Sequence, residues 1–428
     1  MPWFQNFQDG PEYEVRRKRR TFVPPNVTMK AVHDAVPAYL FERSTAKSLF
    51  YVIRHFVIMF AIYYCGSNIN ALPIGEGCMS PLLGKSICVL TWFLYWGWQG
   101  MSFAGIWSLG HEASSVSDLR STSLTVARPK AGHAALSSHP FINTVLGMIL
   151  HSFVLTPYFA WRATHRAHHK ATNNLERDET YIPPTRRDLE LPDRRIAVCL
   201  DYVEALEETP AYTLFKLLVR QFLGYQLYLL HNRKGNSKYP RMTSHYLPNS
   251  KLFKPGQRNS IIISDIAIGI MIALLCIIGQ IKGYAWLWKH YWAPWFFAHN
   301  WIVLFTYLQH SDPTIPYYRK TQWTFVRGAL ATVDRPLFGW VGRFFLHNIN
   351  SDHLAHHFFP NVPFYNLPRV TEAIKPVLGD YYNYDSTPAL YALWRSFTTC
   401  VFVEDEGDVV FFCNRYGEAL MHSKMQPK

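Results

Sequence analysis

Residues 86–109 read SICVLTWFLYWGWQGMSFAGIWSL, a run without a single charged side chain. A helix needs about 20 predominantly apolar residues to cross the hydrocarbon core of a membrane, so this run is long enough. Of the 428 residues in the chain, 49% are hydrophobic and 16% are aromatic, and the apolar residues are gathered into several such runs. The composition therefore predicts membrane spans and argues against two soluble domains.

Three further runs have the length of a membrane span: residues 48–65, 261–281 and 292–308. Two more segments are apolar but interrupted by histidine or basic residues, and we expect them to lie at the membrane interface: residues 141–161 and 212–230. The predicted fold class is an all-α integral membrane protein. It would have about four transmembrane helices, interfacial helices and a cytosolic histidine-rich cap.

The formal net charge is +13, and the basic residues lie between and beside the apolar runs. We therefore expect them at a membrane surface rather than on nucleic acid. RRKRR at residues 16–20 predicts a cytosolic flank of the first span, with a lipid-specific or nucleic-acid patch as the alternatives. The N-terminal region has no signal-peptide pattern, and the seven cysteines form no CxxC pair, so disulfides are not expected.

With a cytosolic N-terminus, each pair of spans returns the chain to the cytosolic face. The predicted domains are a cytosolic N-terminal segment (1–45), membrane helices with two histidine-rich stretches (46–310) and a cytosolic cap (311–428). Dense histidine clusters follow the second and the fourth span: HRAHH at 165–169 and HNINSDHLAHH at 347–357. Because the clusters share one face of the membrane, they can contribute to one site.

The spacing within both clusters is that of a helix face. His165, His168 and His169 are related by steps of three and four, and HLAHH repeats the pattern with His353, His356 and His357. Six imidazoles exceed the four ligands of a tetrahedral zinc site, so two metals are expected. Glu-x-x-His pairs and HExxH are absent. An all-histidine iron pair suits oxygen activation on a hydrocarbon chain; a solvated turn with incidental histidines is the alternative.

The chain resembles the membrane-bound fatty acyl desaturases, of the fungal and plant oleate Δ12 type. The resemblance runs over residues 36–414. It is carried by HKATNNLERDETYIPPTR, TYLQHSDPTIPYY, RGALATVDR, HNINSDHLAHH and EAIKPVLGDYY. It implies three histidine boxes around two iron ions, with molecular oxygen as co-substrate. It also implies a cytochrome b type electron donor with an NADH-dependent reductase. No HPGG motif occurs, so the donor is expected to be a separate protein, and the membrane is expected to be the endoplasmic reticulum.

The first box of this family reads HxxxH, commonly HECGH, but here His111 and His133 are separated by an extra 18 residues. Removal of residues 113–130, ASSVSDLRSTSLTVARPK, would restore HEAGH. The block is either a retained intron in the gene model or a genuine insertion. A flexible loop costs about 2 to 3 kcal/mol of closure entropy. The larger expected problem is that the helix carrying His111 no longer fixes His133.

We expect no catalytic residue beyond the metal ligands. The expected ligands are His111, His133, His165, His168, His169, His353, His356 and His357. Residues that either add a ligand or hold one in place are His310, His347, Glu112, Asp178 and Asp352, although both aspartates also suit solvated turns.

One departure bears on the reaction. After the third box this chain reads HHFFPNVPFYNLPRVT, whereas the family reads close to HHLFSTMPHYHAEEAT. Desaturation at Δ12, oleoyl to linoleoyl, is the first hypothesis. The alternatives are an acyl hydroxylase, an epoxygenase, an acetylenase, a desaturase of a specialised metabolite, or an inactive desaturase-like membrane protein. The sequence leaves open whether the acyl carrier is a phospholipid or coenzyme A.

Overall fold

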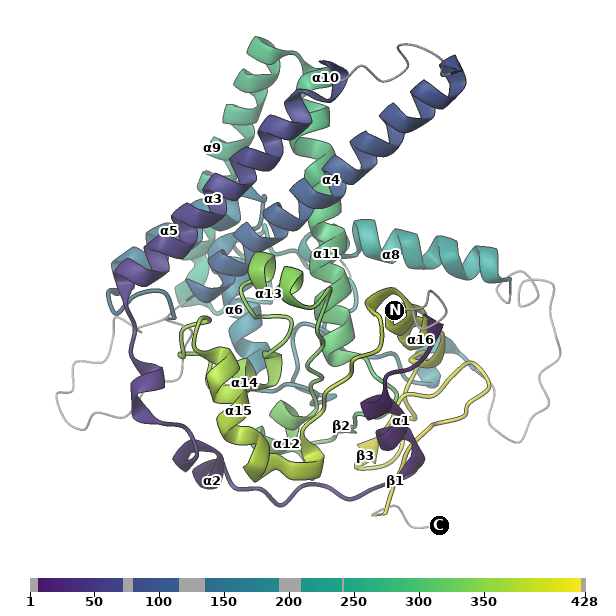
Figure 1. The fold of residues 1–428 in the computed structure, drawn as a ribbon. Coiled ribbons are helices and arrows are strands. Elements are labelled where there is room, and N and C mark those ends of the chain that lie inside the picture. The colour runs from purple at the N-terminus through teal and green to yellow at the C-terminus, as the bar shows by residue number, and fades with distance from the viewer. Residues whose placement is uncertain (1–6, 72–79, 115–134, 192–208, 241, 425–428) are drawn as a thin grey trace.

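The computed structural model describes residues 7–71, 80–114, 135–191, 209–240 and 242–424, most of them helical. Four long helices form a stem that projects from one side of the molecule (Figure 1). They are α3 (Thr45–Ser67), α4 (Pro81–Glu112), α9 (Arg258–Lys282) and α11 (Ala293–His310). The short α10 (Tyr284–Leu287) and a π-helical turn (Trp288–Trp292) join α9 to α11. The four apolar runs are thus confirmed as helices.

By length and hydropathy, two helical segments of the described chain can cross a membrane: Thr45–Ala71 and Pro255–Lys282. A third is added if α5 (Pro140–Phe153) and α6 (Tyr158–His169) form one broken span. α4 contains many Trp and Gly residues in place of aliphatic ones, and α11 contains polar side chains such as His299 and Asn300, which lowers the hydropathy of both helices. The composition of the helices therefore supports two or three membrane spans. It does not establish the predicted number of four.

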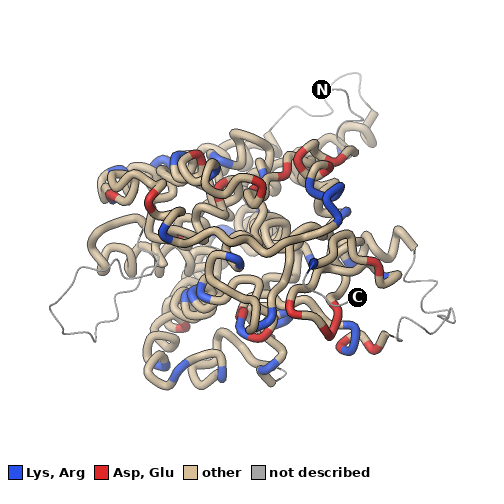
Figure 2. Tube along the Cα trace, turned by 90° about the horizontal axis from the view of Figure 1, so that it is seen from below, with Lys and Arg blue, Asp and Glu red and all other residues tan. Residues whose placement is uncertain are grey.

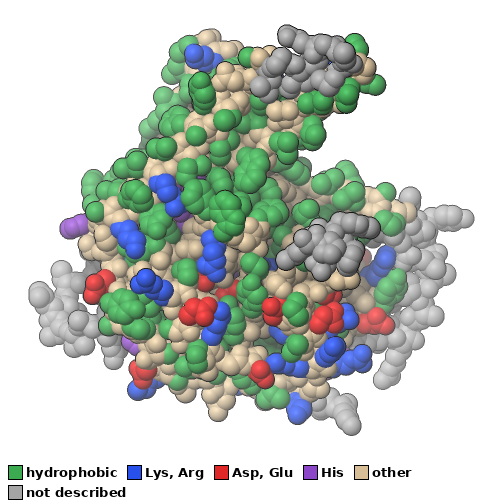
Figure 3. All heavy atoms as spheres, in the orientation of Figure 1, with side chains coloured by type: hydrophobic (Ala, Val, Ile, Leu, Met, Phe, Trp, Pro, Cys, Tyr) green, Lys and Arg blue, Asp and Glu red, His purple; other side chains and the backbone are tan. Residues whose placement is uncertain are grey.

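The outer surface of the stem is apolar. Large side chains such as Phe60 and Val57 on α3, Phe93 on α4, and Ile266 and Ile270 on α9 are more than half exposed. Figure 3 shows hydrophobic side chains over the stem, whereas the charged ones gather over the other part of the molecule. A soluble protein rarely exposes a continuous apolar surface of this kind. The protein is therefore a membrane protein.

Local sequence accounts for the starts of these helices. The side chains of Ser44, Ser80 and Thr209 each accept a hydrogen bond from the backbone N–H three residues later, which caps α3, α4 and α8 (Pro210–His231). Proline follows the cap of α4 and of α8, at the first helical position, where its missing N–H costs nothing.

The segment 141–161, predicted to lie at the membrane interface, contains two helices rather than one. It contains α5 and the start of α6, which meet at 105°. Pro157 disfavours helical geometry at the residue before it, and Leu155 is left-handed with φ of 56°. The other segment, 212–230, lies within the single helix α8, which runs crosswise to the stem (Figure 1).

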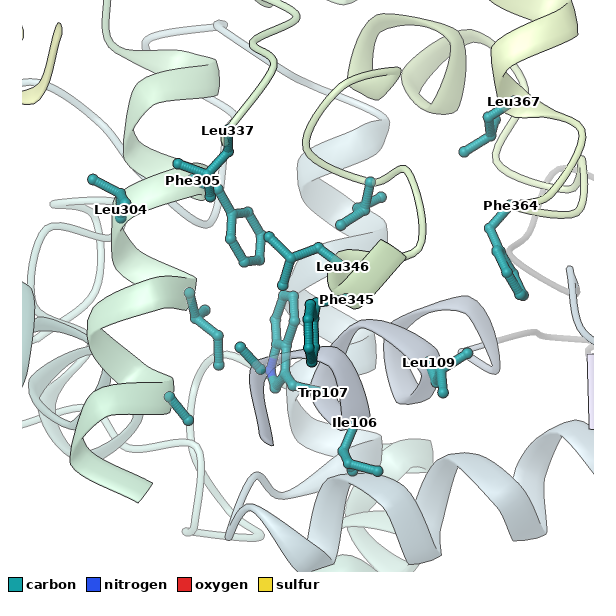
Figure 4. Close-up of a cluster of buried hydrophobic side chains, with 14 of the residues drawn as sticks. Ile106, Trp107, Leu109, Leu304, Phe305, Leu337, Phe345, Leu346, Phe364 and Leu367 are labelled. Atoms are coloured by element: carbon teal, nitrogen blue, oxygen red, sulfur yellow. The ribbon is translucent and has the colours of Figure 1, made fainter. Parts of the chain in front are cut away.

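Inside the molecule, α4 packs against α3 and α11. Gly100 on α4 faces Phe297 on α11 so closely that an added Cβ would lie 2.5 Å from the Cβ of Phe297. Farther along α4, the Trp107 indole lies with its ring centroid 5.9 Å from that of Phe305, and its Nε1 donates to Tyr225 Oη at 2.8 Å. Figure 4 shows Trp107 and Phe305 beside Leu346, with side chains contributed from several elements. This core joins the stem to the cap.

The cap contains five helices in its described part: α12 (Phe325–Leu330), α13 (Trp340–Leu346), α14 (His353–Phe358), α15 (Leu367–Leu378) and α16 (Ala389–Thr399). The all-α expectation is confirmed, and in the described residues the named strands are two residues long and form two small sheets. The strands β1 (Thr21–Phe22) and β4 (His422–Ser423) pair in parallel. The strands β2 (Tyr317–Tyr318) and β3 (Val409–Val410) pair antiparallel.

The N-terminal segment, with α1 (Pro11–Lys18) and α2 (Met29–Asp34), runs along the cap (Figure 1). Residues 16–20, predicted to be a simple basic flank, begin with a buried side chain. Arg16 Nε donates to Thr314 Oγ1 at 3.1 Å, and its guanidinium lies 3.7 Å from Asp312. Figure 2 shows basic and acidic positions intermixed over the side of the cap that it displays, rather than one basic face.

Five charged side chains form a buried ion cluster: Arg16, Asp312, Arg335, Asp385 and Arg395. Arg335 pairs with Asp312 at 2.6 Å and also with Asp385, which Arg395 contacts at 2.5 Å. Burial alone would raise the pKa of Asp385, but Arg335, Arg395 and Arg16 hold it well below its usual value. The cluster therefore ties three distant parts of the chain together.

Replacing Arg335 with methionine should lower the free energy of unfolding by about 3 to 5 kcal/mol, because two buried carboxylates lose a partner. Lys375→Met, which breaks an exposed pair with Glu372, should cost less than about 1 kcal/mol. Thermal unfolding in detergent measures both. Because the folded pKa of Asp385 is depressed, its stabilisation is present above about pH 4 and is lost as the pH falls below that value. Equal effects of the two variants would contradict this account.

Candidate metal centre

Eight histidines from four helices converge where the stem meets the cap. They come from the last turns of α4 and α11, from α6 and from α14: His111, His310, His165, His168, His169, His353, His356 and His357. Seven of them fall into two groups, within each of which the ligand nitrogens lie no more than 4.8 Å apart. The first histidine group is His111, His165, His169 and His356. The second histidine group is His168, His310 and His357.

The first group has His169 at its centre. Its Nε2 lies 3.1 Å from Nε2 of His165 and 3.1 Å from Nε2 of His356. The ring of His111 lies 4.6 Å from that of His165 and 4.7 Å from that of His356, between centroids. Two nitrogens at right angles on one metal, each about 2.1 Å from it, are about 3 Å apart. The spacing therefore fits one metal ion.

His353 extends the second group. Its Nε2 lies 3.0 Å from Nε2 of His310 and 3.0 Å from Nε2 of His357. The two groups adjoin, because the rings of His169 and His357 are stacked with centroids 4.3 Å apart. Burial, followed by repulsion from the neighbouring imidazoles, places the pKa of His357 well below its usual value, so this ring is neutral. Neutral imidazole is the form that binds metals.

Polar side chains outside the two groups contact the outer ring nitrogens. Asp178 accepts a hydrogen bond from His168 Nδ1 at 2.8 Å, and its second oxygen accepts from the backbone N–H of Asn173. Glu112 Oε1 lies 3.0 Å from His111 Nδ1. Thr172 Oγ1 lies 3.1 Å from His357 Nδ1. A carboxylate that holds one ring nitrogen in this way fixes the tautomer and leaves the other nitrogen for a metal.

Two of the candidate residues have other partners. His347 Nε2 lies 3.1 Å from Nδ1 of His55 on α3, and His347 is in neither group. The reason is local, because His347 ends α13 in a left-handed conformation with φ of 54°. Asp352 forms an ion pair with Arg343. The remaining predicted ligand, His133, lies outside the described residues.

Sequence reasoning did not single out Asp334. This buried carboxylate accepts a hydrogen bond from the backbone N–H of Leu354 at 2.9 Å, in the first turn of α14. Its other oxygen accepts from Tyr382 Oη at 2.9 Å. Asp334 thereby caps the helix that carries His353, His356 and His357. The signal in the sequence is its place in RGALATVDR, one of the motifs that carry the family resemblance.

Asp334→Ala should reduce both the metal content and the activity, because the N–H of Leu354 loses its buried acceptor and α14 shifts. We expect a loss of activity of roughly tenfold to a hundredfold, since ligand shifts of about 1 Å have effects of this size. Asp334→Asn keeps an acceptor oxygen and should retain most of the activity. Metal analysis and product yield measure both variants, and equal losses would contradict a positioning role.

A cavity of about 1480 Å³ adjoins the centre. Its wall includes His111, His165 and His168, together with aromatic side chains such as Trp107 and Phe305. A large, mainly apolar cavity beside a group of metal ligands can hold a long hydrocarbon chain next to the metals.

Comparison with known proteins gives consistent similarities. A family model described as fatty acid desaturase matches residues 130–388. A Delta(12) fatty acid desaturase of Mortierella isabellina is 36% identical over 398 residues, which cover 92% of each protein. An oleate hydroxylase of Claviceps purpurea is 33% identical and covers 92% of this chain and 82% of its own length. A Delta(12) acyl-lipid conjugase of Impatiens balsamina is 35% identical over 90% of this chain and 89% of its own.

Proposed function

Because this chain belongs to the fatty acid desaturase family, we propose that it is a Δ12 desaturase that converts an oleoyl chain into a linoleoyl chain. The chain is an oxidoreductase that acts on fatty acids. The observation that carries the proposal is the pair of adjoining histidine groups beside a cavity of about 1480 Å³. The groups can hold metal, and the cavity can hold the acyl chain.

Two iron ions are the proposed cofactors, with molecular oxygen as co-substrate. The first histidine group would hold one ion and the second group, with His353, the other; His133 remains a proposed further ligand. An all-nitrogen donor set suits iron as well as zinc and copper. When bound, the iron pair supplies the oxidising power that an unactivated hydrocarbon requires, and zinc has no redox chemistry to offer.

The side chains of this protein would hold the ligands and exclude water. Asp178 fixes the Nδ1 proton of His168, and Thr172 contacts the outer nitrogen of His357. His356, His357 and their surroundings are buried, so bulk water has no direct access to them. The overall reaction converts CH₂–CH₂ into CH=CH. It consumes one oxygen molecule, two electrons and two protons, and it releases two water molecules.

The electrons would come from a separate cytochrome b type protein and its NADH-dependent reductase. The proposed location is the endoplasmic reticulum membrane, with the histidine groups and the cap on the cytosolic side. The apolar stem and the charged cap support a membrane position with the metal centre near one surface.

Expression in a yeast that makes oleate but no linoleate tests the proposal. Gas chromatography of total fatty acids should reveal a Δ12 diene that an empty vector does not produce. A hydroxylated product would instead favour the activity for which the Claviceps relative is named, and attention would turn to the altered sequence after His357. Absence of either product both from this chain and from a form that lacks residues 113–130, with both forms present in the membrane, would refute the assignment.

A further inference from the structure

The wall of the large cavity is strongly biased in charge. It includes six basic residues, and no aspartate or glutamate of the described chain lines it. The six are Arg186, Lys216, Arg220, Arg233, Lys234 and Arg415. An acyl chain alone gives no reason for such a wall, because hydrocarbon does not interact favourably with cations. The bias points to a negative group on the substrate.

The six residues differ in how their charge is balanced. Arg186 forms two hydrogen bonds of 2.9 Å with the carboxylate of Glu404, which neutralises it. Arg220 instead has aromatic neighbours: its guanidinium lies 3.7 Å from the ring centroid of Tyr307, and it donates to Tyr181 Oη at 3.5 Å. Within the described parts of the chain, no carboxylate forms an ion pair with Arg220, Arg233 or Lys234.

Arg220, Arg233 and Lys234 lie close to one another. The pKa of Lys234 is lowered first by desolvation and then by repulsion from Arg220 and Arg233, and only the weaker attraction of Asp188 opposes this. A left-handed turn after α8 places Arg233 and Lys234 there, with φ of 49° at Asn232 and 67° at Lys234. Arg233 and Lys234 reach the surface, although surrounding atoms remove part of the hydration of Lys234, and Arg220 is half-buried. The three charges therefore run from the mouth of the cavity inward.

We propose that Arg220, Arg233 and Lys234 bind the phosphate of the acyl carrier while the acyl chain extends into the cavity toward the histidine groups. This inference rests on the proposed function and goes beyond it by naming the chemistry that the substrate carries besides its hydrocarbon. Guanidinium groups match phosphate oxygens in pairs, and a lysine adds a point charge. The phosphate comes either from a phospholipid or from a coenzyme A thioester.

The position of α8 supports a phosphate at this place. This helix runs crosswise to the stem, and Leu214, Phe215 and Leu218 on it are exposed apolar side chains. Such a helix lies in the headgroup region of a membrane, with its apolar side chains in the acyl layer. Lys216 and Arg220, one helical turn apart, then lie at the depth of the lipid phosphates.

The test uses the full-length iron-loaded protein in detergent and the triple variant Arg220→Gln, Arg233→Gln, Lys234→Gln. Binding of a fluorescent phosphatidylcholine and of a fluorescent acyl-coenzyme A is measured directly, and KM and kcat follow from turnover. We expect affinity for one of these probes to fall at least tenfold and its KM to rise to match, with kcat within about twofold. The affinity of the unaltered protein should also weaken with added salt.

Lys238→Gln is the matched control, because it removes one charge in the same segment. Lys238 does not line the cavity and pairs with Glu179 at 2.6 Å. Loss confined to phosphatidylcholine identifies a phospholipid carrier, and loss confined to the acyl-coenzyme A identifies a thioester carrier. Unchanged binding of both probes by a stable triple variant overturns the proposal. Absence of turnover in the unaltered protein counts against the proposed function alone, since the binding measurement does not need turnover.

Arg220→Lys keeps the charge and separates a binding role from a packing role. If Arg220 only fills the space between Tyr307 and Tyr181, lysine should lower the thermal stability and leave phosphate binding as weak as glutamine does. Recovery of at least half of the lost affinity by Arg220→Lys is the result expected here. No recovery, with normal binding in the other two single variants, would contradict the inference.

Discussion

Alanine at His356 should abolish formation of the diene and halve the iron content of the purified protein. Nε2 of His356 lies 3.1 Å from Nε2 of His169, and the ring is fully buried. Its loss leaves the first histidine group with three described imidazoles. Because a ligand shift of about 1 Å already costs about a hundredfold, removal of the ligand should cost more.

Product analysis in yeast and metal analysis by mass spectrometry measure the two effects. The expected result is no detectable diene and about one iron per chain in place of about two. His422→Ala is the control, because this histidine is exposed on β4 and should change neither quantity. Full activity in His356→Ala would refute the proposed site. Full iron content without activity would mean that His356 acts on the substrate rather than on the metal.

Deletion of residues 113–130 should raise diene production by about a hundredfold over the full-length chain, the size of effect expected for a displaced ligand. His111 already lies in the first group, and the deletion would bring His133 to four positions after it, which is one helical turn. A ligand carried on the same helix has a fixed direction, whereas one across a long loop does not. Most of this block, and His133 itself, lie outside the described residues, so the prediction rests on sequence spacing. The match to the family model begins at residue 130, the last residue of the block.

Three other results would contradict this prediction, each in a different way. Equal diene from both forms would mean that His133 reaches the metal across the loop. Diene from the longer form alone would refute the retained-intron hypothesis and give the block a part in building the site. No diene from either form, with both present in the membrane, would refute the Δ12 assignment.

The sequence by itself determined the helices of the stem and the helical faces of the two later histidine clusters. Both depend on neighbours within a few residues. In lipid, the backbone N–H and C=O groups of an apolar run must form hydrogen bonds within that run, which makes it a helix. Steps of three and four put imidazoles on one side of a helix. The contact between Asp178 and His168 lies outside this rule, because Asp178 follows the end of α6 and the sequence left a solvated turn open for it.

Only the tertiary structure decided which histidines share a group. His168 and His169 are adjacent in sequence but belong to different groups, because their rings leave α6 in different directions. It also separated His347 from the other histidines and placed Asp334 beneath α14. The buried position of Arg16 and the basic wall of the cavity could not be predicted from the sequence either. These features depend on distances between residues far apart in the chain, which packing of the whole fold sets and local sequence does not encode.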